Sequence, residues 1–262
     1  MADRFELSYV YARVCGALSQ AFLGQKAIDL ARLGRISELW RSFFMDAPPS
    51  VPEASVVVQA ERRAVAESLT GFRTLVAKLR AEEPFFDALR RKAEFARVKR
   101  ILLATGQGPR SPDGLPPSDD PLLPPGFDES AFPNLEKMFA GGRYGWIDEE
   151  SAKDFPATAN RLDRQFYAEL WAELEKIPRW KAGALPRLVR EEIELQNVVW
   201  ALRLKRYYGM DRQQIEGRLV DLGDVDVRSA ALDALSFRFD QREDWNGWAW
   251  ERLLGERSPA AA

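Results

Sequence analysis

Apolar residues recur every three or four positions along most of this 262-residue chain. That spacing places them on one side of an α-helix, and no stretch shows the alternation of apolar and polar residues that is typical of a strand. The sequence therefore predicts an all-α fold of long antiparallel and shorter helices. The expected helices are 7–23, 25–33, 36–44, 53–80, 84–104, 134–140, 158–177, 185–208, 211–222, 227–235 and 245–254.

The composition changes abruptly between residues 106 and 127, where 22 residues include seven prolines and four glycines. Such a composition disfavours helix and is typical of a linker or an irregular surface crossing. On its two sides, EFARVKRILLA at 94–104 aligns weakly with ELQNVVWALRL at 194–204. This similarity indicates a duplicated helical unit within one compact body. The predicted parts are a first helical repeat unit at 1–105, a Pro/Gly-rich linker at 106–132 and a second helical repeat unit at 133–262.

Charge and hydropathy narrow the classes of partner. The chain has 38 Lys plus Arg and 40 Asp plus Glu, a formal net charge of -2, so no global basic field attracts nucleic acid. No run of about 18 apolar residues is present to span a bilayer. Arg13, Ser19 and Gln20 interrupt the stretch where a signal peptide would be apolar. We expect a cytoplasmic protein with no nucleic-acid partner and no direct membrane span.

The chain contains no histidine. This removes the commonest general base, the Ser-His and Cys-His nucleophile pairs and most catalytic zinc sites. Cys15 is the only cysteine, so no intrachain disulfide forms, which suits a reducing compartment. Its neighbours Val14 and Leu18 predict a thiol in the core. We expect no cofactor, no metal site and no catalytic residue.

Acidic side chains are the first candidates for acid–base or metal chemistry. Residues 119–120 lie in the Pro-rich stretch, and DEES at 148–151 is typical of a solvated helix N-terminus. EEIE at 191–194 needs matching acids from other helices, and no Glu-x-x-His motif exists without histidine. A carboxylate-based helical metalloenzyme is therefore the weaker alternative function, and an all-helical cytoplasmic adaptor is another.

Three further stretches have a structural and a functional interpretation. GGRYGW at 141–146 lacks the spacing and the lysine of a phosphate-binding loop, which favours a tight turn. The basic residues within 90–100 favour a solvated helix face over a docking site. In the predicted helix 245–254, Trp245 and Trp248 share a face and Trp250 points elsewhere. Core packing is the favoured interpretation of these tryptophans, and contact with a partner is the alternative.

Asn197 interrupts an apolar face of the predicted helix 185–208. A second apolar face lies roughly opposite, which predicts neighbours on two sides. A buried amide without partners costs about 1–3 kcal/mol, so Asn197 should bond to a neighbouring helix, loop or backbone carbonyl. At 100° per residue, the face of Asn197 also holds Ile193, Trp200, Ala201, Leu204 and Tyr208, and the opposite face holds Leu195, Val198, Val199 and Leu202.

The order of these motifs resembles that of the C-type subunits, known as d-type in eukaryotes, of the rotary V/A-type ATPases. YVYARVCGALSQAFLG followed by IDLARLGRISELW is similar to that family's N-terminal helices. EFARVKRILLA, LPPGFD and LEKMF resemble its first helix of the form E-x-x-x-hydrophobic-K and its mid-chain turn and helix. RLDRQFYAEL, with Asp163, resembles the start of a later repeat, and EIELQNVVWALRLKRYYGM resembles a family helix matched here at Asn197 and Arg203. The likeness runs from Tyr9 to about Leu254.

This resemblance implies a fold and a function. Members of the family are all-helical, funnel-shaped central-stalk subunits built from related helical repeats. They sit on the membrane rotor ring, receive the foot of the central axle and hydrolyse nothing themselves. The resemblance thus implies a peripheral protein on the cytoplasmic face that couples its two partners in ATP-linked ion or proton transport. The family usually shows a threefold repeat, whereas two copies are identified here.

Overall fold

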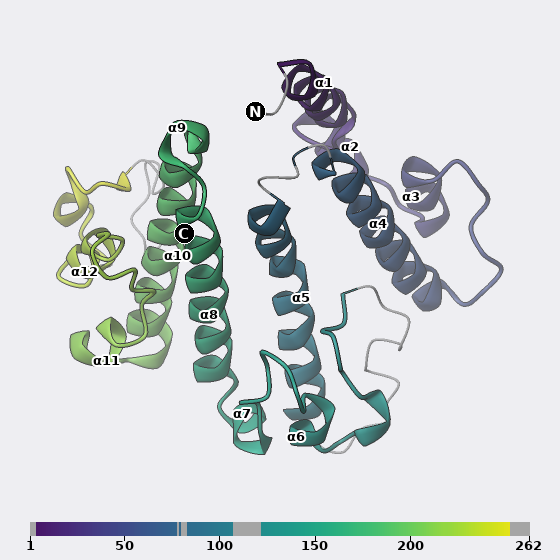
Figure 1. Ribbon diagram of the computed structural model, residues 1–262. Helices are drawn as coiled ribbons and strands as arrows, with labels where there is room; N and C mark the ends of the chain where they lie inside the picture. Colours follow the sequence, from purple (N-terminus) through teal and green to yellow (C-terminus); the bar gives the residue numbers. More distant parts are fainter. Residues whose placement is uncertain (1–3, 78, 80–82, 107–121, 252–262) are drawn as a thin grey trace. The chain divides into compact units, whose positions relative to one another are not determined.

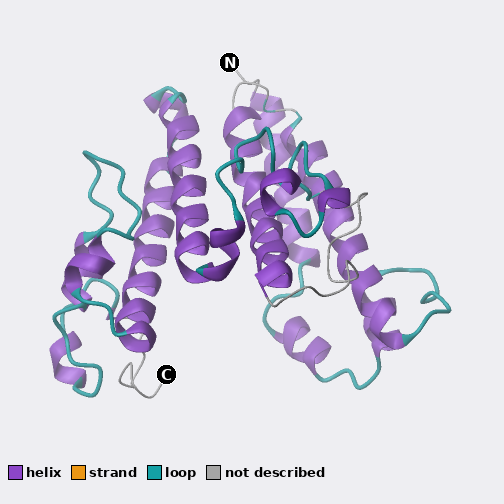
Figure 2. Cartoon of the chain, turned by 90° about the horizontal axis from the view of Figure 1, so that it is seen from below, coloured by secondary structure: helices purple, strands orange, loops and turns teal. Residues whose placement is uncertain are grey.

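The computed structural model describes residues 4–77, 79, 83–106 and 122–251 (Figure 1). Within these ranges helices dominate and no strand is present, apart from an isolated bridge between Leu222 and Val225 (Figure 2). The predicted all-α fold is confirmed. The elements are α1 Arg4–Gln20, α2 Gln25–Ala31, α3 Ile36–Phe43, α4 Glu53–Val76, α5 Glu83–Gly106, the 3-10 turn η2 Glu129–Ala131, α6 Leu135–Met138, α7 Glu149–Lys153, α8 Phe155–Glu175, α9 Arg179–Ala182, α10 Leu185–Tyr208, α11 Arg212–Glu216, α12 Ser229–Ala234 and the 3-10 turn η3 Arg242–Trp245.

Local side-chain chemistry explains where several helices begin and end. The Asp148 carboxylate accepts a hydrogen bond from Ser151 N, and the Ser151 hydroxyl accepts one from Asp148 N, which forms a capping box at α7. This confirms the predicted helix N-terminus at 148–151. The same arrangement joins Asp211 and Gln214 at α11. Gly209 ends α10 with a φ of 61°, a left-handed conformation that glycine adopts without a steric penalty.

The predicted helix 245–254 is wrong, the predicted helix 211–222 ends early at Glu216, and one short helix was not predicted. The stretch expected as helix 245–254 begins at the last residue of the 3-10 turn η3 and continues through turns, without α-helix, as far as residue 251. Gly247, with a φ of 75°, departs from helical geometry and breaks the pattern. The short helix α9 was not predicted, because its four residues carry no periodicity. Most of the Pro/Gly-rich stretch, residues 107–121, lies outside the described residues.

The chain forms two compact units with a boundary inside α5, between Arg90 and Arg91. The first contains α1 to α4 and the start of α5, and the second contains the remainder of α5 and the elements from η2 onwards. The repeat units expected from the sequence divide the chain at 105 and 133. The repeat units were predicted from internal sequence similarity, whereas the two units described above are defined by compactness. The division into repeat units therefore stays a prediction.

The first unit has a small core between α3 and α4. Trp40 and Phe44 are buried with Val56, and the Trp40 and Phe44 rings lie 4.7 Å apart. The Arg63 guanidinium lies 4.3 Å from the centroid of the Phe44 ring and is held there by Asp46 at 2.7 Å. This core therefore joins the end of α3 to the middle of α4.

The second unit is built on the antiparallel pair α8 and α10 (Figure 1). On the α10 side, α11, α12 and the C-terminal tryptophans cover Val198, Ala201 and Leu204. The two-sided burial predicted for α10 is confirmed, except that Tyr208 at its end is exposed. None of the helices among the described residues is long and apolar enough to cross a membrane.

Candidate functional site

Asn197 is 1% exposed and makes three hydrogen bonds to backbone groups. Its Nδ2 donates to Val220 O at 3.0 Å and to Val227 O at 2.8 Å. Its Oδ1 accepts from Val220 N at 2.7 Å. Both amide protons and one acceptor site are thus satisfied, which confirms the predicted buried amide with backbone partners.

A second buried asparagine, which the sequence analysis missed, binds the same loop from α8. Asn160 Nδ2 donates to Arg218 O at 2.7 Å, and Arg164 Nη1 donates to Gly217 O at 3.1 Å. We call residues 217–227 the clamped loop, because side chains from both α8 and α10 bind its backbone. The signal for Asn160 was present, since it shares a face of α8 with Tyr167 and Leu170, which are buried.

Asp163 connects three helices. Its carboxylate accepts a hydrogen bond from Lys99 Nζ of α5 at 2.5 Å and another from Trp200 Nε1 of α10 at 3.1 Å. The side chains of Lys99 and Asp163 are 24% and 17% exposed, so water screens this ion pair only in part. We call this group the three-helix tie, and it fixes α5, α8 and α10 at one level.

GGRYGW forms the predicted tight turn, in which Gly145 N donates to Gly142 O at 3.1 Å. The turn places Tyr144 in the core, where its hydroxyl donates to the buried carboxylate of Glu94 at 2.9 Å. Burial, together with the charge of Glu94, raises the pKa of the Tyr144 phenol above its ordinary value. The phenol is therefore a permanent donor, and it anchors the turn to α5.

The basic stretch of α5 is not the solvated face that the sequence favoured. Lys92 forms an ion pair with Glu192 of α10, and Arg91 lies 3.6 Å from Glu169 of α8. Tyr167 also donates to Glu192, at 3.2 Å, and burial raises the pKa of its phenol. Arg91 is partly buried opposite an acid of α8, whereas Lys92 remains exposed although it pairs with Glu192. The sequence of α5 alone does not show those acids.

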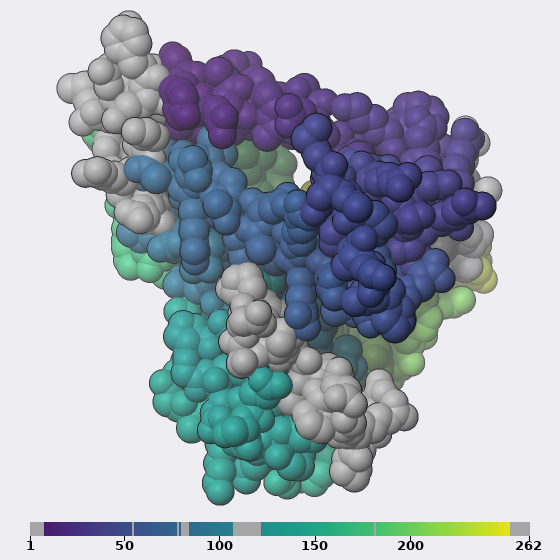
Figure 3. Space-filling model, turned by 90° about the vertical axis from the view of Figure 1, so that its right-hand side faces the viewer, coloured from purple at the N-terminus to yellow at the C-terminus, as the bar shows by residue number. Residues whose placement is uncertain are grey.

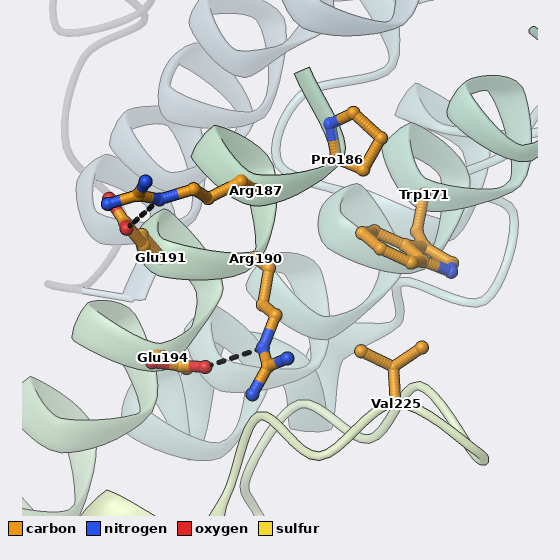
Figure 4. Close-up of a pocket in the computed structure, with 7 residues that line it drawn as sticks. All are labelled: Trp171, Pro186, Arg187, Arg190, Glu191, Glu194 and Val225. Atoms are coloured by element: carbon orange, nitrogen blue, oxygen red, sulfur yellow. Dashed lines mark hydrogen bonds and ion pairs between the residues drawn. The ribbon is translucent and has the colours of Figure 1, made fainter. Parts of the chain in front are cut away.

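The acidic residues 191–194 take part in ion pairs along α10. Arg187 donates to Glu191 and Arg190 donates to Glu194, each at 2.8 Å (Figure 4). Trp171, Pro186 and Val225 form the apolar wall of a pocket beside these pairs. The charges of this pocket are already neutralised by one another, which favours a surface hollow over a catalytic site. No group of three or more acidic or cysteine side chains among the described residues could hold a metal ion.

The C-terminal tryptophans fill the core around α12. Trp245 is fully buried, and its Nε1 donates to Arg238 O at 2.8 Å. Trp248 Nε1 donates to Ala230 O at 2.8 Å, and Trp248 and Trp250 are each 7% exposed. The core-packing interpretation agrees with this burial, and little indole surface is left for a partner.

Two further predicted residues lie at the surface. Arg203 is exposed on α10, so its place in the family motif is not explained by packing. Cys15 is exposed on α1, and the expected core thiol is wrong. Its neighbour Val14 is half-buried, whereas Cys15 lies about 100° further round the helix.

The fold and these contacts define an all-α protein whose buried polar side chains fix helices and loops of the same chain. A family model described as ATP synthase (C/AC39) subunit matches residues 37–237. The chain belongs to this family, and the resemblance found in the sequence is confirmed. Asp163, Asn197 and Arg203 all lie within the matched residues.

A relative with a similar sequence gives no further indication of function. An uncharacterized protein of Treponema pallidum (strain Nichols) is 27% identical over 254 residues, which covers 94% of this chain and 73% of that protein. No solved structure matches the chain.

Proposed function

We propose that this chain is a non-catalytic central-stalk subunit of a rotary V/A-type ATPase. It couples the central axle to the membrane rotor ring in ATP-linked ion transport and is peripheral on the cytoplasmic face. Membership of the ATP synthase (C/AC39) subunit family supports the assignment to such a complex. The rotor ring and the axle are its proposed partners.

The three-helix tie is the observation that supports a mechanical role most directly. A protein that transmits torque must resist the sliding of its helices past one another. Apolar packing alone is tolerant of such sliding, whereas a hydrogen bond weakens once its atoms separate beyond about 3.5 Å. Since one helical turn is about 5.4 Å, a slide of one turn breaks both bonds of Asp163, which measure 2.5 and 3.1 Å.

The clamped loop supports the same role. Asn160 and Asn197 lie on antiparallel helices and bind backbone groups of one short segment. Relative movement of α8 and α10 therefore has to break hydrogen bonds of buried groups, which is costly because water does not replace them. Both features are consistent with a rigid body that carries load between two partners.

Purification from membranes tests the proposed function. The tagged full-length chain should co-purify with the ATPase from detergent-solubilised membranes of its own organism, and the isolated chain should hydrolyse no ATP. The tag alone, expressed in the same cells, is the control. Recovery of the chain free of the ATPase, with unrelated partners, would instead favour the helical adaptor.

A further inference from the structure

The N-terminal helices of the first unit have almost no core of their own. From Ser8 to Leu39 none of the described residues is buried, and the first buried side chain is Trp40. Helix α1 contacts α4, and its half-buried residues are Val10 and Val14. A helix rich in apolar residues gains stability by burying them, so this exposure indicates a surface that a partner covers.

Three exposed apolar residues of α1 form a line, whereas Tyr9, which is 49% exposed, lies on the opposite side of the helix. Tyr11 is 72% exposed, Leu18 is 58% exposed, and Cys15 between them is also exposed. These three positions lie within about 60° of one another on a helix. Phe22 continues the line beyond the end of α1, and its ring centroid lies 4.7 Å from that of Phe43. We call the five residues Tyr11, Cys15, Leu18, Phe22 and Phe43 the α1 seam. The segment from α1 to α3 that carries the seam is coloured purple in Figure 3.

The spacing of the seam fits a helix better than a flat surface. Within α1, Tyr11, Cys15 and Leu18 are separated by four and three residues. This alternation is the one with which a helix presents a narrow apolar stripe to another helix. A helix that lies on a membrane needs a broad apolar face instead, together with basic residues on its polar face.

The charge around the seam indicates the sign of the partner. Between Ser8 and Met45 the chain has five basic residues and two acidic ones. Lys26 Nζ lies 2.7 Å from Ser19 O, directly after the seam residue Leu18. Complementary charge favours a partner with acidic residues beside its apolar stripe. The seven charged residues are all exposed, and Arg13 alone of them lies within α1, on the side opposite the seam: Arg13, Lys26, Asp29, Arg32, Arg35, Glu38 and Arg41.

We propose that the α1 seam docks a helix of another protein, which carries apolar residues at heptad spacing flanked by Asp or Glu. The proposal goes beyond the coupling function, because it assigns a binding role to one face of the first unit and states the chemistry of the partner that binds there. It does not depend on the identity of the complex. The geometry of the seam and its basic surroundings are sufficient to define the partner.

Cys15 provides a direct probe, since it is the only cysteine and lies in the seam. The rate at which a maleimide labels Cys15 is measured on the full-length chain with a synthetic helical peptide that has leucines at heptad spacing flanked by glutamates. At ten times the dissociation constant, binding leaves about one-eleventh of the protein free and slows labelling roughly tenfold. A matched peptide with lysines in place of the glutamates should give little protection.

Two other results would overturn the proposal. Equal labelling with and without the glutamate peptide contradicts a helix-binding seam. Protection of Cys15 by vesicles of phosphatidylcholine and phosphatidylglycerol, but not by the peptide, assigns the surface to a membrane instead. Neither measurement involves the ATPase, so failure here is distinguishable from failure to co-purify.

A pair of variants tests the seam by itself. Leu18→Glu places a charge in the stripe and should abolish the protection of Cys15 by the glutamate peptide. Gln20→Glu adds the same charge on the opposite side of α1 and should leave protection unchanged. Helix content by circular dichroism checks folding of both variants. If Leu18→Glu does not fold, Arg32→Glu with Arg35→Glu should reverse the preference towards the lysine peptide, and an unchanged preference contradicts the proposal.

Discussion

At the scale of single residues, buried amides fix which backbone segments lie together. Asn197 satisfies a backbone N–H and two carbonyls that water cannot reach, and Asn160 satisfies a third carbonyl. An apolar side chain of similar size fills the same space but leaves those groups without partners. The two asparagines therefore specify the position of the clamped loop, in addition to any contribution to stability.

We predict that Asn197→Leu lowers the free energy of unfolding by about 1–3 kcal/mol, because buried backbone groups lose their partner. Chemical denaturation followed by circular dichroism measures this change. The matched control is Arg203→Leu on the exposed side of α10, which should stay within about 0.5 kcal/mol of the unmodified chain. Equal stability of both variants would show that the Asn197 bonds contribute nothing.

Asp244 gives a prediction about pH. Arg238 donates two side-chain hydrogen bonds to this carboxylate, and these bonds lower the pKa of Asp244 to about 2. The unfolded chain binds this proton near pH 4, so the contribution of the pair is present above that pH and is lost as the pH falls through about 2. NMR titration of the carboxyl carbon should give the low midpoint. In Arg238→Ala the midpoint should return towards 3.8, and an unchanged midpoint contradicts the assigned cause.

At the scale of elements, polar contacts set the register between α5, α8 and α10. Asp163 and Glu192 each accept bonds from two different elements, and Glu94 holds the turn that contains Tyr144. Apolar side chains fill the spaces between these levels. The helices are thus joined at several heights, which opposes sliding more effectively than one contact does.

The Lys99–Asp163 pair should show measurable coupling. We predict that a double-mutant cycle with Lys99→Met and Asp163→Asn gives an interaction energy of about 0.5–3 kcal/mol, because the two groups are in contact and partly buried. The Asp163→Asn variant keeps an oxygen that can accept the hydrogen bond from Trp200 Nε1, so the cycle measures the effect of removing the charge of Asp163. Chemical denaturation of the four proteins gives the cycle. Additive effects would mean that the pair does not hold α5 against α8.

Alkaline pH should destabilise the second unit through Tyr144. Its phenol keeps its proton in the folded protein, whereas the unfolded chain loses that proton near pH 10. The folded state therefore loses stability as the pH rises above about 10. In Tyr144→Phe the slope of unfolding free energy against pH should fall by the equivalent of one proton. An unchanged slope would place the titration elsewhere.

The elements show what a single sequence reveals. Periodicity was sufficient for α1, α4, α5, α8 and α10, because long helices carry several turns of pattern, and it also predicted the shorter helices α2 and α3. Periodicity failed for the tryptophan-rich stretch 245–251. There Gly247 has a positive φ that is incompatible with a continuous helix, and the three indoles are nevertheless buried. Periodicity was sufficient for Asn197, a polar residue on an apolar face. It failed for the basic stretch of α5, since the acids that face it lie on other helices.

At the scale of the whole molecule, the two compact units offer different properties. The second unit contains the polar ties and the covered core, and the first exposes the α1 seam. The chain belongs to the ATP synthase (C/AC39) subunit family, and the two properties proposed for it are a rigid scaffold and a docking surface. Neither property requires a catalytic group in this chain.

ATP-driven ion transport in membrane vesicles tests the central claim most directly. Inverted vesicles from cells that lack this chain should retain ATP hydrolysis by the catalytic head but lose ATP-driven ion uptake. Expression of the unmodified chain from a plasmid should restore uptake, which excludes an effect on neighbouring genes. Full ion uptake in vesicles that lack the chain would contradict its coupling role.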